Sequence, residues 1–218
     1  MNLVQLSKTL LFQGIRPEET EAMLKCLSAR TGTYQKGETI YRAGDTVTEV
    51  GIVLSGSVLI QNDDIWGNRS ILDQIGPGQV FAETYACVPE ERFMVTAEAA
   101  ERSEILFLNV GRILRVCTNA CGFHSRLIRN LLSLAAQKNL NLSRRIFHTS
   151  AKSIRGRLLS YLSWQAQIRG SREFEIPFNR QQLADYLSVD RSALSAELGK
   201  MKREGLIQVE KNHFKMEK

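Results

Sequence analysis

Residues 179–209 read NRQQLADYLSVDRSALSAELGKMKREGLIQV. This pattern predicts two short helices joined by a tight corner at Ser188 and followed by a strand. Asn179 can cap the first helix, and Gln182, three residues later, completes a capping box. Asp190 can cap the second helix, and Gly205 can end it. The segment therefore predicts a helix-turn-helix unit.

The second of these helices has two unlike faces. Leu194, Leu198 and Met201 recur at helical spacing and form its buried stripe. At about 100° per residue the opposite face is made of small or basic residues. That outward face comprises Ser192, Ala196, Gly199 and Arg203, with Ser195 on its flank and Arg191 in the first turn.

A small-residue face of this kind suits a helix that lies deep in the major groove of DNA, where its N-terminal turn approaches base edges. Serines can bind bases or phosphates, and Asn179 with Arg180 can hold phosphates at the first helix. The alternative is a helical hairpin inside a core, against which the basic flank argues. The expected DNA-binding residues are Asn179, Arg180, Arg191, Ser192, Ser195, Gly199 and Arg203.

The positive charge of the chain is concentrated in its last third. The 218 residues have a net charge of +6, with 29 basic and 23 acidic residues. From Arg144 onward there are 15 basic and 8 acidic residues, whereas the preceding part has 14 and 15. This asymmetry is typical of a polyanion-binding module joined to a neutral one, although an ordinary solvated basic surface would also produce it.

Upstream of this region the pattern changes twice. Residues 31–109 contain short β-rich runs separated by glycines, which predicts an antiparallel sandwich or roll, and residues 17–27 precede it with helical spacing. Residues 123–147 contain neither Pro nor Gly and predict one long helix. Its thin apolar stripe favours a dimer seam over a helix that lies on its own domain. The seam residues are Ile128, Leu131, Ala135, Leu142 and Ile146.

The remaining elements complete a winged helix. Residues 149–167 predict an amphipathic helix, and REFEIPF (172–178) alternates like an edge strand that ends at Pro177. LIQVEKNHFKM (206–216) predicts two short strands around a turn at Lys211 and Asn212. We expect an α+β protein with an N-terminal antiparallel β-roll, a long dimerisation helix and a C-terminal winged helix-turn-helix.

The whole chain resembles the cyclic-AMP receptor protein / fumarate-nitrate regulator (Crp/Fnr) family of bacterial transcription factors. The resemblance lies in KGETIYRAGD (36–45), VGIVLSGSVLI (50–60), GPGQVFAE (76–83), the long helix and the helix-turn-helix segment. It implies an effector-binding, cyclic-nucleotide-binding-like roll (a double-stranded β-helix) at 1–121, a dimerisation helix at 122–148 and a DNA-binding winged helix at 149–218. It also implies a homodimer that reads a near-palindromic operator, and RNA polymerase as a partner if the protein activates transcription.

The resemblance also assigns roles within the helix-turn-helix. Arg191 matches the family's leading recognition-helix arginine, and Arg180 a phosphate-contacting one. Ser192 stands where a base-reading glutamate is frequent, and Ala196 where arginine is usual. These two departures imply an operator half-site that differs from the best-known one of the family.

The effector region departs further from the cyclic-nucleotide binders that it resembles. The glycine–glutamate pair of those proteins appears as Ala82-Glu83, and the arginine–serine pair as Phe93-Met94, with Arg92 one place away. A buried cyclic phosphate needs a cation and hydrogen-bond donors, so these residues argue against cyclic AMP and for an apolar or aromatic effector. A decayed site that holds only core side chains is the alternative. The expected effector residues are Phe81, Ala82, Glu83, Thr84, Arg92, Phe93, Met94, Lys138 and Asn139.

Other functional classes have less support. A thiol-responsive regulator could use Cys87 or the pair Cys117 and Cys121, although buried, inert thiols are the default for cysteines. We find no nucleotide loop, zinc-spaced His/Glu pair or nucleophile elbow, so we do not expect an enzyme, a metal site or a cofactor. A sensory module that acts on a protein partner is disfavoured by the winged helix. No apolar run approaches the roughly 18 residues of a membrane span, and the start resembles no signal peptide, so we expect a cytoplasmic protein with reduced cysteines.

Overall fold

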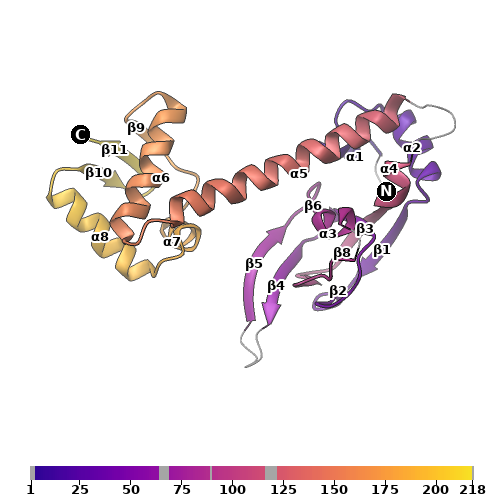
Figure 1. The fold of residues 1–218 in the computed structure, drawn as a ribbon, viewed down its shortest axis with the longest axis horizontal. Coiled ribbons are helices and arrows are strands. Elements are labelled where there is room, and N and C mark those ends of the chain that lie inside the picture. Colours follow the sequence, from indigo (N-terminus) through magenta and orange to yellow (C-terminus); the bar gives the residue numbers. More distant parts are fainter. Residues whose placement is uncertain (1–2, 64–68, 89, 116–121, 218) are drawn as a thin grey trace. The chain divides into compact units, whose positions relative to one another are not determined.

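The computed structural model describes residues 3–63, 69–88, 90–115 and 122–217. The chain divides into two compact units, Met1–Gln137 and Lys138–Lys218. The long helix α5 (Gly122–Thr149) contributes residues to both units (Figure 1). The uninterrupted helix that the sequence predicts over residues 123–147 is therefore present.

Two antiparallel four-stranded sheets form the roll of the first unit, as the short glycine-bounded runs predict. The first sheet has the order β1-β8-β3-β6, with β1 at Arg30–Tyr34, β8 at Ser103–Asn109, β3 at Glu49–Ser55 and β6 at Val80–Phe81. The second has the order β2-β7-β4-β5, with β2 at Thr39–Tyr41, β7 at Thr96–Ala99, β4 at Val58–Asp63 and β5 at Arg69–Ile75. Val53, Phe81, Ala97 and Phe107 are among the buried residues that pack together in the core of this roll.

The turn between β3 and β4 requires glycine. Gly56 has a φ of +77°, and a Cβ atom there would lie 2.5 Å from the carbonyl oxygen of Arg102 and 2.3 Å from Oγ of Ser103. The Ser103 hydroxyl also accepts a hydrogen bond from the backbone N–H of Ser57 at 3.0 Å. No side chain fits between these groups, so the sequence keeps glycine where the chain reverses.

Helices form a second core against the first sheet. They comprise α1 (Leu3–Leu6), the 3₁₀ turn η1 (Leu10–Phe12), α2 (Pro17–Cys26), α4 (Val110–Leu114) and the first part of α5. Leu127, Leu131 and Leu134 of α5 are buried in this core together with Phe12 and Met23. Part of the apolar face of α5 is thus buried within the first unit.

The second unit is a winged helix-turn-helix, as the sequence predicts. It contains α6 (Ile154–Arg169), β9 (Glu173–Glu175), α7 (Arg180–Leu187), α8 (Arg191–Arg203), β10 (Ile207–Glu210) and β11 (His213–Met216). The three strands pair antiparallel in the order β10-β11-β9. Lys211 and Asn212 connect β10 to β11, and Lys211 adopts the left-handed conformation at φ +50°. Leu183, Leu187, Leu194, Leu198 and Met201 lie in the core of this unit.

Candidate functional site

The predicted outward face of α8 is exposed. Asp190 caps the helix, with Oδ1 accepting hydrogen bonds from the N–H groups of Ser192 and Ala193 at 2.8 and 2.9 Å. Leu194, Leu198 and Met201 are buried, whereas the exposed side of the helix presents Ser192, Ser195, Ala196 and Arg203. A Cβ atom at Gly199 would meet only Nη1 of Arg203, at 3.6 Å. The backbone of α8 is therefore accessible at Gly199 to a partner outside the chain.

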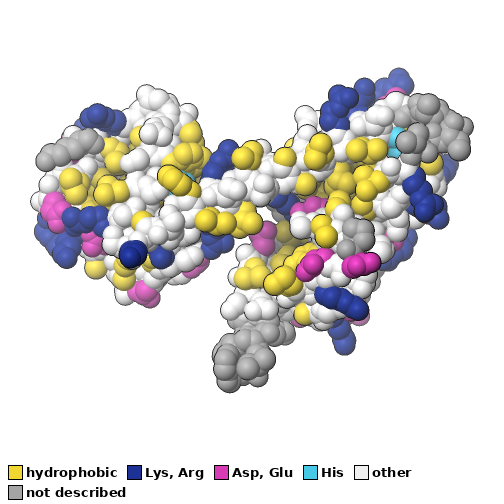
Figure 2. Space-filling model, in the orientation of Figure 1, with side chains coloured by type: hydrophobic (Ala, Val, Ile, Leu, Met, Phe, Trp, Pro, Cys, Tyr) yellow, Lys and Arg dark blue, Asp and Glu magenta, His cyan; other side chains and the backbone are white. Residues whose placement is uncertain are grey.

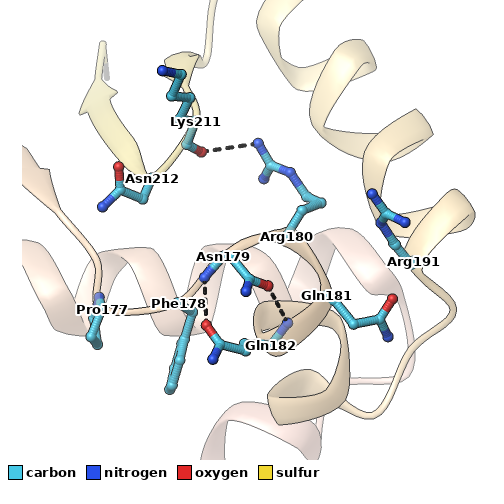
Figure 3. A pocket seen from close by; sticks show the side chains of 9 residues that line it. All are labelled: Pro177, Phe178, Asn179, Arg180, Gln181, Gln182, Arg191, Lys211 and Asn212. Carbon is cyan, nitrogen blue, oxygen red and sulfur yellow. Dashed lines mark hydrogen bonds between the residues drawn. The ribbon is translucent and has the colours of Figure 1, made fainter.

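A groove of about 810 Å³ lies beside this helix, and its lining comes from α7, the start of α8 and the wing turn. Figure 3 shows Arg180 between the turn at Lys211 and the first residue of α8, Arg191. Among the described residues that line the groove, these three are cationic and none is acidic. The full lining is Pro177, Phe178, Asn179, Arg180, Gln181, Gln182, Arg191, Lys211 and Asn212. Such a groove attracts anions of the size of nucleic-acid phosphates.

The capping box of α7 forms the edge of this groove. Oδ1 of Asn179 accepts from the N–H of Gln182 at 2.9 Å, and Oε1 of Gln182 accepts from the N–H of Asn179 at 2.8 Å. Both predicted capping residues thus make the predicted bonds (Figure 3). The bonds fix the first turn of α7 and hence the position from which Arg180 extends.

Arg180 is held against the wing. Its Nη2 donates to the carbonyl oxygen of Lys211 at 3.2 Å. Burial lowers the pKa of the guanidinium, but arginine stays protonated because its ordinary pKa is far above neutral pH. A partly desolvated cation beside two others gains from an external anion. The sequence did not point to Lys211 as part of this cluster, although it placed that residue at the wing turn.

The helix-turn-helix is fixed from behind by arginines of α6. Nε of Arg155 donates to Glu197 at 2.6 Å, and both terminal nitrogens donate to Glu204 at 2.7 and 2.9 Å. Nη1 of Arg157 donates to the carbonyl oxygens of Leu187 and Ser188 at 2.9 and 2.8 Å, at the corner between α7 and α8. The bonds of Arg157 satisfy carbonyl oxygens at the end of α7, and the charged bonds of Arg155 hold α8 against α6.

The hydroxyl of Ser192, which we expected to bind DNA, makes a hydrogen bond within the protein. It donates to Oδ1 of Asp190, the same oxygen that caps α8. A base contact by Ser192 would need this hydroxyl to rotate away from Asp190. Ser195 lies on the exposed side of α8 and is the serine better placed for an outside partner.

Comparison with known proteins finds a matching domain family in each of the two units. Residues 31–120 match the model of the cyclic nucleotide-binding domain, and residues 156–217 match the Crp-like helix-turn-helix domain. The chain belongs to the Crp/Fnr family. Members of this family are transcription regulators that bind DNA through the helix-turn-helix, so the groove and the exposed face of α8 lie in the DNA-binding domain of a Crp-like regulator.

Individual Crp-like relatives are distant. The chain is 33% identical over 98 residues to the cyclic AMP receptor protein of Thermus thermophilus, a match that covers 45% of this chain and 44% of that protein. It is 23% identical over 212 residues to the CRP-like cAMP-activated global transcriptional regulator of Mycobacterium tuberculosis, covering 94% and 91%. The structure of CprK complexed with OCPA has a TM-score of 0.62 at 15% identity, covering 90% of this chain and 91% of that one.

The Crp-like roll has an unusual residue at the position that resembles the family's glycine. Ala82 adopts a φ of +63°, the left-handed conformation that glycine adopts without cost, directly before the short helix α3 (Glu83–Cys87). Glu83 begins this helix and is buried, whereas Thr84 is exposed. Ala82 therefore holds a backbone conformation that a glycine would adopt without strain.

Phe93 is buried, whereas the neighbouring Met94 is exposed. Phe93 is 2% exposed, and its ring centroid lies 4.8 Å from that of Tyr85 and 5.8 Å from that of Tyr41. Met94 is 69% exposed. Phe93 is thus part of the aromatic core of the roll, which also includes Phe81.

The remaining expected effector residues are exposed. Arg92 is exposed, and its Nη1 donates to the carbonyl oxygen of Gly44 at 3.1 Å. Lys138 and Asn139 are exposed residues of α5 and belong to the second unit. An effector role for the nine residues stays a prediction.

The thiol alternative gains little from the described cysteines. Cys87 is exposed at the end of α3, and desolvation of its sulfur followed by the nearby Glu83 carboxylate raises the pKa of its thiol. A raised pKa makes a cysteine less reactive, because the thiolate is the nucleophile. Cys117 and Cys121 lie outside the described residues. In the described ranges, no cluster of three or more His, Cys, Asp or Glu side chains could hold a metal ion, and no helix is long and apolar enough to cross a membrane.

Proposed function

We propose that this Crp-like regulator binds a near-palindromic operator as a homodimer, with α8 of each protomer in the major groove. The observation that supports this best is the acid-free groove with Arg180, Arg191 and Lys211 beside the small-residue face of α8. Phosphates of the DNA backbone would occupy the groove between α7 and the wing turn. Arg191, in the first turn of α8, would then reach a base edge.

The dimer would form along α5. Ile128, Leu132, Ala135, Asn139, Leu142 and Ile146 follow one another at alternating steps of four and three residues. This is the a/d spacing of a two-stranded coiled coil. Leu132, Leu142 and Ile146 are exposed large hydrophobic residues in the single chain, and yellow side chains run along α5 in Figure 2.

The proposed seam does not include Leu131, which the sequence analysis expected there. Leu131 is 4% exposed because it packs into the core of its own unit, so it is not available to a partner helix. The neighbouring Leu132, which sequence analysis passed over, is 69% exposed and takes its place. Asn139, which we expected near an effector, stands at a seam position, where a polar residue can fix the register of two helices.

We further propose that the roll responds to a small molecule other than cyclic AMP. Neither Phe93 nor Met94 can pair with a phosphate, and the buried ring of Phe93 packs on Tyr85 and Tyr41. An apolar or aromatic effector fits these side chains better. A roll whose effector site holds only core side chains is the second candidate, and the burial of Phe81 and Phe93 supports it.

Two experiments test the proposed function. Selection from a pool of random DNA should enrich a near-palindromic site, and recovery of unrelated sequences would contradict operator reading. Native mass spectrometry of freshly purified protein should give the mass of two chains, with a small bound molecule if an effector is retained. A cytoplasmic location, contact with RNA polymerase and the absence of enzyme activity belong to the same proposal as properties of such a regulator.

A further inference from the structure

We propose that a second pocket binds a small planar aromatic carboxylate. It is lined by residues of α5, α6 and α7 and by Pro177 and Phe178, which lie between β9 and α7, all within the unit Lys138–Lys218. The pocket has a volume of about 310 Å³. This volume is at the lower end of the range typical of small-molecule sites, so its ligand is about the size of one ring with a short substituent. The site contains no residue of the roll, and its ligand is distinct from the effector proposed above.

Aromatic residues make up half of the lining. Tyr161, Trp164, Phe178 and Tyr186 all line the pocket. The ring centroids of Phe178 and Tyr186 lie 5.0 Å apart, those of Tyr161 and Tyr186 5.4 Å, and those of Tyr161 and Trp164 6.4 Å. A planar ligand can stack on such faces or meet their edges, which adds to the gain from burying its apolar surface.

The charge at the pocket selects for an anion. Arg144 of α5 lies with Cζ 5.6 Å from the ring centroid of Trp164, and its Nη1 donates to Oδ1 of Asn141 at 3.0 Å. A guanidinium has five N–H donors in a planar fork, so one such bond leaves donors for a carboxylate. Among the described residues that line this pocket, Arg144 is the one basic residue and none is acidic. An aromatic cation would therefore be repelled, whereas an aromatic carboxylate is matched by both the rings and the charge.

An unsatisfied polar group lies next to the same rings. His148 is fully buried, and its ring centroid lies 5.3 Å from that of Trp164 and 5.6 Å from that of Tyr161. Nδ1 is 3.1 Å from Oγ of Ser160, but Nε2 has no hydrogen-bond partner among the residues that the structure describes. Buried polar atoms are nearly always paired, so this nitrogen is an exception beside the rings of the pocket, although His148 itself does not line it.

Intrinsic fluorescence tests the proposal without DNA. The chain has two tryptophans, and Trp66→Phe leaves Trp164 as the one reporter. Titration of this variant with benzoate should give a saturable change in Trp164 emission with a stoichiometry of one. Arg144→Gln should weaken binding about tenfold, as expected for loss of a charged hydrogen-bond partner. The matched control Arg172→Gln removes the same charge from an exposed residue of this unit that does not line the pocket, and it should leave binding unchanged.

Two further titrations test the ligand class. Benzamide, the neutral counterpart, should bind more weakly than benzoate, and Asn141→Asp should weaken benzoate by placing a carboxylate beside it. A change in emission that rises linearly without saturation would overturn the site. Equal affinity for benzoate and benzamide, or equal losses in Arg144→Gln and Arg172→Gln, would overturn the anionic ligand class. None of these results bears on operator binding, so the two proposals fail separately.

Discussion

The guanidinium of Arg155 donates to both carboxylate oxygens of Glu204, from Nη1 to Oε2 at 2.7 Å and from Nη2 to Oε1 at 2.9 Å. Arg155 lies in the first turn of α6, and Glu204 directly follows α8. Together with the bond from Arg155 to Glu197, this pair fixes the half of α8 that is remote from Arg191. The orientation of the exposed face of α8 thus depends on ion pairs made by its other side.

Replacing Glu204 with Gln should reduce the free energy of unfolding near neutral pH and leave a smaller effect in acid. Arg155 holds the pKa of the Glu204 carboxyl below its ordinary value of 4.5. A depressed carboxyl pKa stabilises the folded state at pH values above 4.5, and this stabilisation is lost as the pH falls through the folded-state pKa. Urea unfolding of wild type and variant, near neutral pH and well below pH 4.5, measures the difference.

The control for this prediction is Glu210→Gln, an exposed carboxylate of β10. It should change stability little at either pH. A gap between wild type and Glu204→Gln that stays constant with pH would contradict the assignment of the ion pair.

The variants Arg191→Ala and Arg180→Ala should weaken DNA binding in different ways. If Arg191 reads a base edge, its loss should cost about 1–3 kcal/mol of binding and relax the preference at one base pair per half-site. If Arg180 contacts a phosphate, its loss should weaken binding evenly across sequences and lower the salt slope by about one. Isotherms on the selected operator and on a scrambled duplex at two salt concentrations separate the two.

Lys36→Ala, which removes one exposed charge from the first unit, is the control for this pair. It should leave both the affinity and the base preference unchanged. Equal loss on operator and scrambled DNA for Arg191→Ala would show that Arg191 contacts phosphate and reads no base.

Gly199→Leu should separate folding from DNA binding. A Cβ atom at Gly199 meets nothing nearer than the end of Arg203, so the fold can accept a side chain there. Removal of glycine from the interior of a helix should raise stability by about 0.5–1 kcal/mol. The same side chain should hold α8 away from the bases, so operator affinity should fall while the melting temperature rises. Intact affinity would mean that this face of α8 does not enter the groove of the operator.

Two adjacent leucines offer the sharpest test of the dimer. Leu132→Glu places a charge on the exposed stripe of α5 and should yield folded monomers in sedimentation experiments, with weak operator binding. Leu131→Glu buries the charge in the core of the first unit and should destabilise folding by several kcal/mol. If Leu132→Glu remains dimeric, the seam lies elsewhere.

Local patterns allowed much of this structure to be predicted. The capping of α7 by Asn179 and Gln182 and of α8 by Asp190 depends on residues two or three apart, so the sequence contains the whole signal. The antiparallel roll follows in the same way from short runs and glycine turns. These features are the ones that a single sequence specifies most directly.

The errors and omissions arise where distant segments meet. Arg155 and Glu204 are 49 residues apart, and no spacing rule links them. Leu131 and Leu132 have equal hydrophobicity, and the difference between them depends on which side of α5 packs against the core that α2 and α4 help to form. Arg180 and Lys211 come together because the wing folds back toward α7, which the sequence predicts as topology but not as a contact.

The composition of the basic groove has a consequence for how the protein can sense its surroundings. Among the described residues that line it, none is Asp, Glu or His, the side chains whose ordinary pKa values lie in acid or near neutral pH. A change of cellular pH therefore finds no carboxylate or imidazole to act on in the described lining of this groove. An acid response of operator binding can instead reach α8 through the carboxylates that hold it, Asp190 at its first turn and Glu204 behind its end.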